Sequence, residues 1–478
     1  MSVNPASVEA AVHQLDAVLA GSVITPEHPD YDEARMVWNG MVDKRPALII
    51  RCKAVADVIQ AVDFARANAM TVAVRGGGHS TIGYGTCDDG LVIDLAGMKG
   101  ISIDPDGQTV QAQAGLTWGD FDAATQQYGL AVTGGRFSTT GVSGLTLGSG
   151  SGWLERKCGL TGDNLLEVEL VTADGRVVKA SPTENADLFW GLRGGGGNFG
   201  IVTSFTLKLH QVGPIVYGGL MMSTPDRGKD IMRFMRDYMK DAPEDLGAAV
   251  AWVSAPPEEF VPEEMHFAPG VGVVICWTGS IEDGERVCAP IREVAQPVVD
   301  VVGPMPYTAL QQMMDGGGPK GIRGYMKAEF IEDLTDDAID VLVEHGGKRP
   351  GPLVNLLLEP MGGAISDVAD GESALGRRDV AWCYHALALW MEPDPETERA
   401  HVAWARDFAT AMAPHTVPGV YLNYTSDQGE ERVRSTYGPE KYERLVALKD
   451  KYDPGNLFRL NQNIRPSLEA TARADRPD

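Results

Sequence analysis

The distribution of glycine constrains the fold of this 478-residue chain more than any other feature of its sequence. Of its 56 glycines, 28 lie between Arg75 and Gly200, in about a quarter of the chain. The segment shows neither an internal repeat nor low complexity. Glycine concentrated in this way is typical of left-handed turns and of loops whose backbone closely approaches a ligand. We therefore predict several tight loops in one domain, around a ligand that is large and flat or phosphorylated.

Charge and cysteine content exclude several classes of protein. With 41 Lys and Arg against 66 Asp and Glu, the net charge is −25, which repels nucleic acid and anionic membrane surfaces. No apolar run reaches the roughly 20 residues needed to span a bilayer, and residues 8–24 lack the basic start of a signal peptide. The six cysteines stand singly, against a disulfide framework or a zinc site. We expect a soluble, cytoplasmic protein without metal, nucleic-acid or membrane partners.

Helix and strand patterns alternate in the first part of the chain. A short apolar run at 72–75 reads as a strand, and apolar residues spaced three and four apart over 55–65 predict a helix. A glycine-containing turn divides residues 168–180 into a predicted hairpin. These patterns predict an α+β domain over residues 1–213, with its core at about 40–213.

Glycine becomes sparser after this point, and the pattern changes. Segments with the alternation of strands mix with helical segments, which predicts a second α+β domain at 214–415, built on an antiparallel sheet flanked by helices. The strand candidates are 270–277, 353–358 and 380–390, and the helix candidates are 229–240 and 336–345. A C-terminal segment follows at 416–466, and the polar residues 467–478 are predicted to be disordered.

One dinucleotide-binding fingerprint occurs, at Gly195, Gly197 and Gly200. In a Rossmann unit this motif opens a helix whose N-terminus faces a pyrophosphate. Residues 201–209 instead alternate as a strand, so the context fails and we do not expect a nicotinamide dinucleotide site. The sequence also lacks phosphate-loop, zinc-protease and serine-hydrolase motifs.

The run from Arg75 to Ser80 has a different character. A predicted strand ends in three consecutive glycines, which leave successive backbone N–H groups free to form an anion-binding nest. His79, at the end of this nest, would stand beside the rest of a phosphorylated ligand. Taken alone, the run fits a tight turn followed by a surface histidine equally well.

Three further glycine-rich stretches tip this balance, at residues 134–152, 159–164 and 194–200. Together with residues 75–80 they resemble the FAD-binding domain of the vanillyl-alcohol-oxidase and para-cresol-methylhydroxylase (PCMH) superfamily, in its berberine-bridge-enzyme-like branch. Residues 421–424 (Tyr-Leu-Asn-Tyr) and 437–464 match the closing signature of that branch. The resemblance covers about residues 30 to 466, and it is nearest to bacterial members with one flavin-linking histidine and to flavoenzymes of polyketide pathways.

The resemblance implies a two-domain flavoprotein, with a PCMH-type FAD-binding domain and a substrate domain, whose C-terminal segment packs back on the FAD domain. It implies that His79 carries the FAD covalently. A second link through cysteine is not expected, because Phe137 occupies the matching position. Thr140 stands where relatives control the access of oxygen, and it is not the bulky leucine associated with blocked access. The other residues expected at the cofactor are Arg75, Gly76, Gly77, Gly78, Ser80, Thr81, Gly141, Ser143, Gly144, Gly148, Trp153, Asp163, Asn164, Gly200, Val202, Asn461 and Asn463.

The implied chemistry needs a group that takes a proton while a hydride leaves the substrate for flavin N5. The resemblance gives this role to Tyr424, with Tyr421 as the competing phenol. A phenol has an ordinary pKa of about 10 and needs a cationic or hydrogen-bonding neighbour to act near neutral pH. His385, on the predicted strand 380–390, stands where relatives carry Glu or Gln, and histidine titrates at about pH 6.5. The choice of base stays open between Tyr424 and His385. The alternative without a catalytic role is that both tyrosines are aromatic wall residues of the site and that His385 is a hydrogen-bonded core residue.

These features together predict an FAD-dependent oxidoreductase that acts on a small organic substrate at a C–H bond next to O or N. Molecular oxygen is the expected electron acceptor, giving hydrogen peroxide. One alternative is an oxygenase-type tailoring enzyme of secondary metabolism. The other is a non-catalytic flavoprotein that sequesters a small aromatic compound.

Overall fold

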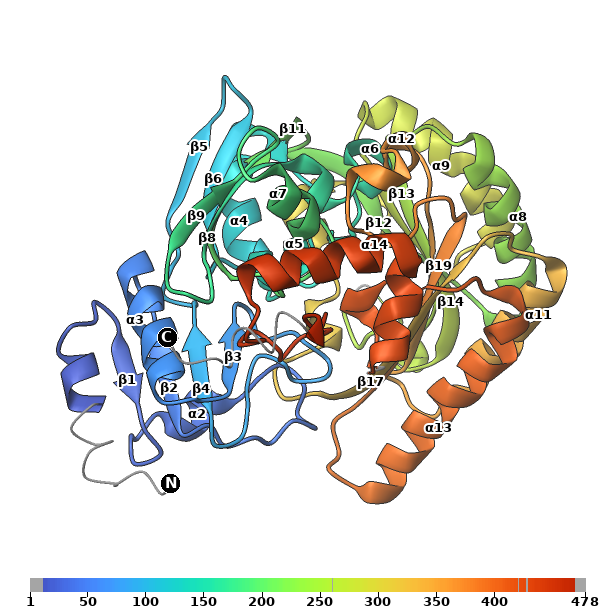
Figure 1. The fold of residues 1–478 in the computed structure, drawn as a ribbon. Helices are drawn as coiled ribbons and strands as arrows, with labels where there is room; N and C mark the ends of the chain where they lie inside the picture. The colour runs from blue at the N-terminus through green and yellow to red at the C-terminus, as the bar shows by residue number, and fades with distance from the viewer. Residues whose placement is uncertain (1–11, 260, 420, 427–428, 469–478) are drawn as a thin grey trace.

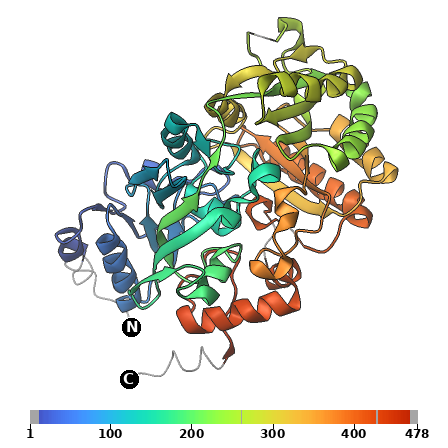
Figure 2. The same cartoon turned by 90° about the horizontal axis from the view of Figure 1, so that it is seen from above.

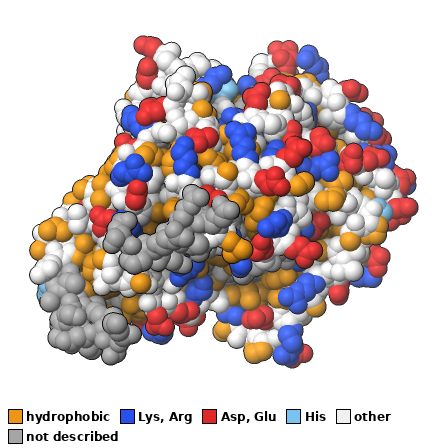
Figure 3. Space-filling model, in the orientation of Figure 1, with side chains coloured by type: hydrophobic (Ala, Val, Ile, Leu, Met, Phe, Trp, Pro, Cys, Tyr) orange, Lys and Arg blue, Asp and Glu red, His pale blue; other side chains and the backbone are white. Residues whose placement is uncertain are grey.

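The computed structural model describes residues 12–259, 261–419, 421–426 and 429–468. Figures 1 and 2 show two halves side by side, each with its own sheets and helices, and the helix α14 running across their junction. The predicted α+β class is confirmed. Among the residues that the structure describes, no helix combines the length and apolar character that crossing a bilayer demands. Figure 3 shows acidic and basic side chains interspersed on the face it presents.

The first half begins with a four-stranded sheet in the order β1-β2-β4-β3. Strands β2 and β3 both run parallel to β4, with α3 packed against it. The elements are β1 (Ser22–Ile24), α2 (Tyr31–Arg35), β2 (Leu48–Arg51), α3 (Val55–Ala67), β3 (Val72–Arg75) and β4 (Leu91–Asp94).

A five-stranded antiparallel sheet in the order β5-β6-β10-β8-β9 completes this half. The predicted hairpin is present as β8 and β9. The glycines at 194–200 are followed by the strand β10 and not by a helix, as we predicted when we rejected a Rossmann unit. The elements are β5 (Ile101–Asp104), β6 (Thr109–Gln113), α4 (Trp118–Thr125), β7 (Leu130–Ala131), α5 (Val142–Leu147), α6 (Glu155–Cys158), β8 (Leu165–Val171), β9 (Val177–Ala180), α7 (Ala186–Leu192), β10 (Ile201–Lys208) and β11 (His210–Gln211).

The second half is built on one eight-stranded antiparallel sheet. The order is β15-β12-β14-β13-β18-β19-β17, with β16 paired to β12. The elements are β12 (Ile215–Ser223), α8 (Gly228–Asp241), β13 (Leu246–Ser254), β14 (Pro269–Trp277), α9 (Ile281–Ala295), β15 (Val299–Asp300), β16 (Gly303–Pro306), α10 (Tyr307–Gln312), β17 (Arg323–Ile331), α11 (Asp336–Gly347), β18 (Asn355–Pro360), α12 (Ala364–Asp367), β19 (Trp382–Trp390) and α13 (Pro395–Met412).

Strand β19 shows how this sheet divides its two faces. Trp382, Tyr384 and Trp390 pack into a core with residues of the helices α8, α9, α11 and α13. His385 and Leu387 point the other way and line a cavity at the junction of the two halves. The alternation predicted from the sequence is therefore confirmed, and it leaves one face of the sheet available for a ligand.

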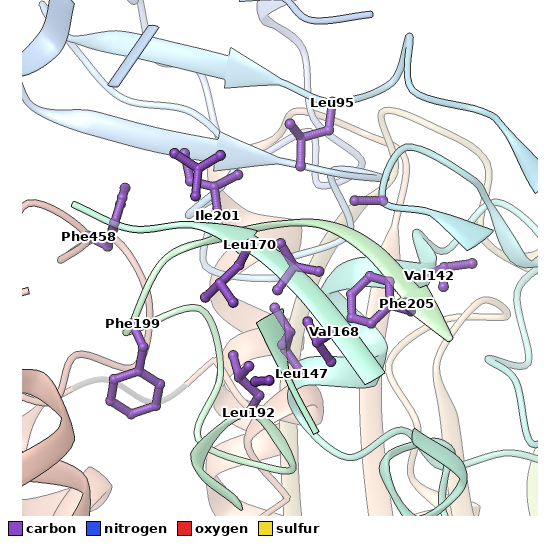
Figure 4. Packing of buried hydrophobic residues seen from close by; sticks show 14 of the residues in the cluster. Leu95, Val142, Leu147, Val168, Leu170, Leu192, Phe199, Ile201, Phe205 and Phe458 are labelled. Atoms are coloured by element: carbon purple, nitrogen blue, oxygen red, sulfur yellow. The ribbon is translucent and has the colours of Figure 1, made fainter. Parts of the chain in front are cut away.

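The last helix, α14 (Glu430–Tyr452), is kinked at Gly438, where φ is +71°. It packs on α7, and its Leu445 and Leu448 join the core of the first half. Phe199, Phe205 and Leu170 belong to that same core (Figure 4). The tail predicted to be disordered lies outside the described residues from 469 onward. Short 3-10 turns are η1 (Gln126–Tyr128), η2 (Thr161–Asn164), η3 (Pro225–Arg227), η4 (Glu263–Met265), η5 (Asp315–Gly317), η6 (Asp370–Glu372), η7 (Ala413–His415) and η8 (Leu422–Tyr424).

A fully buried ion pair fastens the C-terminal segment to the glycine-rich loop before β10. Lys449 Nζ lies 2.6 Å from Asp453 Oδ2 and donates to the carbonyl oxygens of Asn198, at 2.9 Å, and Phe458, at 3.0 Å. Asp453 accepts in turn from the backbone N–H groups of Leu457 and Phe458. Burial lowers the pKa of Lys449, and these partners hold its charge in place.

Replacing this lysine should destabilise the protein strongly, because Asp453 would stay buried without its counter-charge. We expect Lys449→Ala to lower the free energy of unfolding by about 3–5 kcal/mol, measured by urea denaturation. Lys348→Ala is the matched control, since Lys348 pairs with Glu344 on the exposed surface, where a pair contributes about 0–1 kcal/mol. Equal losses in the two variants would contradict a special role for the buried pair.

Candidate active site

A cavity of about 340 Å³ lies where the two halves meet the C-terminal segment. Its walls come from the glycine-rich loops of the first half, from β17, β18 and β19 of the second, and from η8 and the chain after α14. Fifteen of the residues predicted at the cofactor line it: Arg75, Gly76, Gly77, Gly78, His79, Ser80, Thr81, Thr140, Gly141, Ser143, Gly144, Gly148, Gly200, Val202 and Asn461. Tyr424 and His385 line it as well.

Two loops cross backbone to backbone at one end of this cavity. A Cβ atom on Gly77 would lie 2.2 Å from the backbone N of Gly141, and a Cβ on Gly141 would lie 2.2 Å from the backbone N of Gly77. No side chain fits between them. Both positions therefore require glycine to bring the loops together.

The loop after β3 is anchored by a buried ion pair. Arg75 Nη2 donates to Asp94 Oδ2 at 2.7 Å, and the two residues face each other across the parallel strands β3 and β4. The guanidinium of Arg75 thus ties β3 to β4 through Nη2, while its Nη1 makes no hydrogen bond among the described residues. The three glycines that follow present their backbone to the cavity, where N–H groups can bind a pyrophosphate.

Other glycines leave room for a ligand rather than for neighbouring protein. A Cβ on Gly144 or Gly197 would meet no atom within 4 Å, although both residues line the cavity. Asn461 donates to the carbonyl oxygen of Gly197 at 3.2 Å, whereas its buried Oδ1 makes no hydrogen bond among the described residues. A cradle of backbone with unused polar atoms fits a flat, phosphorylated cofactor such as FAD.

His79 is half-buried in the same wall. Its Nε2 lies 2.9 Å from Thr139 Oγ1, and its ring stacks on that of Trp38 with the centroids 5.2 Å apart. Burial lowers the pKa of His79 to about 4, so the imidazole is neutral at pH 7 and keeps a lone pair for bond formation. Phe137 lies beside Trp38, with ring centroids 6.3 Å apart, and also lines the cavity.

Four residues predicted at the cofactor do not line the cavity. Trp153 lies behind it, under the guanidinium of Arg136 at 4.7 Å. The Asp163 carboxylate is paired with Arg378, at 2.6 Å and 2.9 Å. Asn164 donates to the carbonyl oxygens of Cys158 and Leu160. Asn463 is the fourth. The buried Oδ1 of Asn463 has no hydrogen-bond partner among the described residues.

A buried polar cluster centred on Arg136 borders the same cavity. Arg136 Nη1 donates to Tyr424 OH at 3.1 Å and lies 3.0 Å from Glu359 Oε1, while Nη2 donates to Glu155 Oε1 at 3.3 Å. His385 Nε2 lies 3.4 Å from Glu359 Oε2, and its ring is edge-on to that of Tyr424 at 3.7 Å. The cluster joins three segments that are far apart in the sequence.

Burial sets the protonation of both predicted bases. It raises the pKa of Tyr424 well above its usual value, although Arg136 acts in the opposite direction. It lowers the pKa of His385 well below 6.5, and the nearby Arg136 lowers it further. Both side chains are therefore neutral at pH 7. Tyr421, the competing phenol, accepts from Asn423 Nδ2 at 3.0 Å and lies outside the main cavity.

Sequence reasoning missed Glu359 altogether and did not single out Arg136. Both lie in the cavity wall, and the exposure of Glu359 is only 1%. One signal was available: an acidic residue directly follows the predicted apolar strand 353–358, and charged residues are rarely buried without a partner. Met314, Met326, Leu357 and Leu387 add an apolar part to the cavity wall.

Comparison with known proteins agrees with this geometry. The chain matches an FAD binding domain over residues 46–181 and the berberine and berberine-like family over residues 420–465. An FAD-linked oxidoreductase of Dictyostelium discoideum is 34% identical over 90% of this chain and 91% of that protein. (R)-6-hydroxynicotine oxidase of Paenarthrobacter nicotinovorans is 32% identical over 94% of this chain and 97% of that protein.

A solved structure is also similar over nearly the whole chain. 6-Hydroxy-D-nicotine oxidase from Arthrobacter nicotinovorans aligns with a TM-score of 0.85 at 30% identity, over 94% of this chain and 98% of that one. The fold and the site thus define an FAD-linked oxidoreductase. The chain belongs to the berberine-bridge-enzyme-like family, as the resemblance predicted.

The crossing of the two loops predicts different effects for two glycine substitutions. We expect Gly77→Ala to lower both the thermal unfolding midpoint and the flavin-to-protein absorbance ratio, because the new methyl collides with the backbone of Gly141. Gly144→Ala should keep the midpoint of flavin-free protein, prepared from riboflavin-starved cells, and should lower only the flavin content. An unchanged midpoint in flavin-free Gly77→Ala would contradict the crossing.

Proposed function

We propose that this oxidoreductase carries FAD covalently on His79 and oxidises a small organic molecule at a C–H bond next to O or N. Oxygen is the proposed electron acceptor, with hydrogen peroxide as product. One observation carries the proposal: the glycine cradle with His79 and the polar cluster with Tyr424 line one cavity. A cofactor in the cradle and a substrate at the cluster would therefore meet.

The residues present fit the cofactor, as the cradle and the unused amide oxygen of Asn461 indicate. The glycines at 76–78 would hold the pyrophosphate through backbone N–H groups. His79 would supply the covalent link through its neutral imidazole. When bound, the flavin supplies an acceptor for the hydride. Thr140 lines the cavity, and a threonine there, instead of a bulky leucine, is consistent with the proposed use of oxygen.

Residues of the polar cluster would bind and orient the substrate. Tyr424, held by Arg136, would orient the hydroxyl or amine of the substrate by hydrogen bonding. The apolar side chains of Met326, Leu357 and Leu387 would hold the body of the molecule and exclude water. This lining favours a compact substrate with an apolar body; 6-hydroxynicotine, in the names of the similar nicotine oxidases, is a small two-ring molecule.

The covalent link is tested by acid precipitation. We expect yellow colour in the pellet of wild-type protein and, for His79→Ala, in the supernatant, because no other linking residue is proposed. His210→Ala is the matched control: His210 is also held neutral, burial lowering its pKa to about 4, but it bonds Asn164 away from the cavity. Colour that stays in the pellet of His79→Ala would overturn the assignment.

Oxidase activity is tested by peroxide release with chemically different probes. We expect release with 6-hydroxynicotine or with a benzylic alcohol, and little with xylobiose, whose many hydroxyl groups the apolar wall would leave unpaired. Anaerobic mixing should bleach the flavin with the same preference. Turnover of xylobiose alone would contradict the proposed substrate class, and label from ¹⁸O₂ in the organic product would favour an oxygenase.

A further inference from the structure

Neither base predicted from the sequence is well placed to take a proton. Tyr424 would have to act as a phenolate that burial disfavours, and His385 would have to become a cation beside Arg136. Glu359 borders the same cavity. A carboxyl ionises far more easily than a phenol, and its carboxylate becomes neutral, not cationic, when it takes a proton. This inference rests on the proposed function, because it concerns the proton of the same reaction.

We propose that the Glu359 carboxylate accepts the proton of the substrate during oxidation. The O–H or N–H bond of the substrate breaks, and its proton passes to Glu359. The electron pair of that bond forms the second bond between carbon and the heteroatom, and the C–H hydride leaves for the bound flavin. Two electrons leave with the hydride, so the balance needs only the flavin and then oxygen.

The position of Glu359 on β18 directs it at the cavity. Leu357 pairs with His385 across β18 and β19, and Glu359 pairs with Cys383. Because alternate residues share a face, Leu357 and Glu359 lie on the cavity side of the sheet with His385. Among the described residues, no hydrogen bond reaches Oε1 of Glu359, although Arg136 Nη1 lies 3.0 Å away. That oxygen keeps a lone pair available for a substrate proton.

The charge balance of the cluster favours proton uptake at this residue. Arg136 faces two buried carboxylates, Glu359 at 3.0 Å and Glu155 at 3.3 Å, so the cluster holds one cation and two anions when both are ionised. Protonation of Glu359 removes the excess negative charge and leaves Arg136 paired with Glu155. In a buried site an unpaired charge is costly. Proton transfer to Glu359 is therefore favoured by the surroundings.

Burial raises the pKa of Glu359, and Arg136 limits the rise. A carboxyl whose pKa is raised towards the working pH is suited to general-base catalysis. The ionised form is the active one, so the reductive step should weaken as the pH falls through this raised pKa. The titratable and charged groups around Glu359 are Arg136, Glu155, Tyr424, His385 and Cys383, with Tyr421 and Arg377 across the second cavity described below.

Glu359 also borders a second, smaller cavity, which none of the glycines of the cradle lines. Its volume of about 10 Å³ is close to that needed for one water molecule. Ser151, Tyr421 and Arg377 line it with Glu359, and the side chain of Arg377 is 27% exposed. The two cavities give Glu359 a substrate side and a side towards the surface, by which the proton can leave between turnovers.

The test combines a spectroscopic titration with kinetics, using flavin-loaded protein. In infrared difference spectra of wild type minus Glu359→Gln, we expect a carboxylic-acid band that disappears as the pH rises through neutrality. Stopped-flow reduction of the flavin by the benzylic alcohol, whose O–H proton Glu359 would take, should slow about 10²–10⁴-fold in Glu359→Gln. The flavin-reduction rate that remains in Glu359→Gln should no longer fall at low pH as it does in the wild type. KM should change by a smaller factor than this rate.

Glu155→Gln is the matched control, because it removes the same charge beside Arg136 without lining either cavity. This variant should keep the acid limb, at a shifted midpoint. No titrating band, or an unchanged acid limb in Glu359→Gln, would overturn the assignment of Glu359 whatever the substrate. Failure of the proposed function would be seen in other measurements: the flavin would be lost from the acid pellet, or none of the probes would bleach the flavin of the wild-type protein. In either case the infrared titration would still test the assignment of Glu359.

Discussion

The contact between the backbones at Gly77 and Gly141 is the constraint on which the cavity depends. Each loop is fixed from behind: Arg75 is paired with Asp94, and the N–H of Trp118 donates to the carbonyl oxygen of Thr140 at 2.9 Å. Neither loop can retreat without breaking these contacts. The wall facing the ligand is therefore made of backbone held in one arrangement, which suits a flat cofactor whose phosphates need several N–H donors at once.

Two buried cations connect this wall to segments far away in the sequence. Lys449 ties the end of α14 to Asn198 in the glycine-rich loop, and Arg136 ties the loop before α5 to β18 and η8. A buried charge is tolerated only when several partners satisfy it, so each cation requires its partners to stay in place. The same requirement that stabilises the fold thus keeps these parts of the cavity wall in place.

Local patterns in the sequence predicted much of the fold, because they depend on neighbouring residues. The hairpin of β8 and β9, the strand after the glycines at 194–200, and the two faces of β19 all follow from short-range alternation. The family and the cradle with His79 followed from distinctive motifs. Asp163 and Glu359 show the limit of such patterns. The carboxylate of Asp163 is paired with Arg378, which is distant in the sequence. Glu359 lies beside Arg136 only because β18 packs against the loop that carries Arg136.

The sequence by itself determined the glycine loops, the linking histidine candidate and the family, since these are properties of consecutive residues and of recognisable motifs. Only the tertiary structure decided which groups share the cavity and what charge they carry. Tyr424, His385 and Glu359 come from three separate elements, and their protonation depends on burial and on the distance to Arg136. Burial and distance arise when distant segments pack together, and no local pattern encodes them.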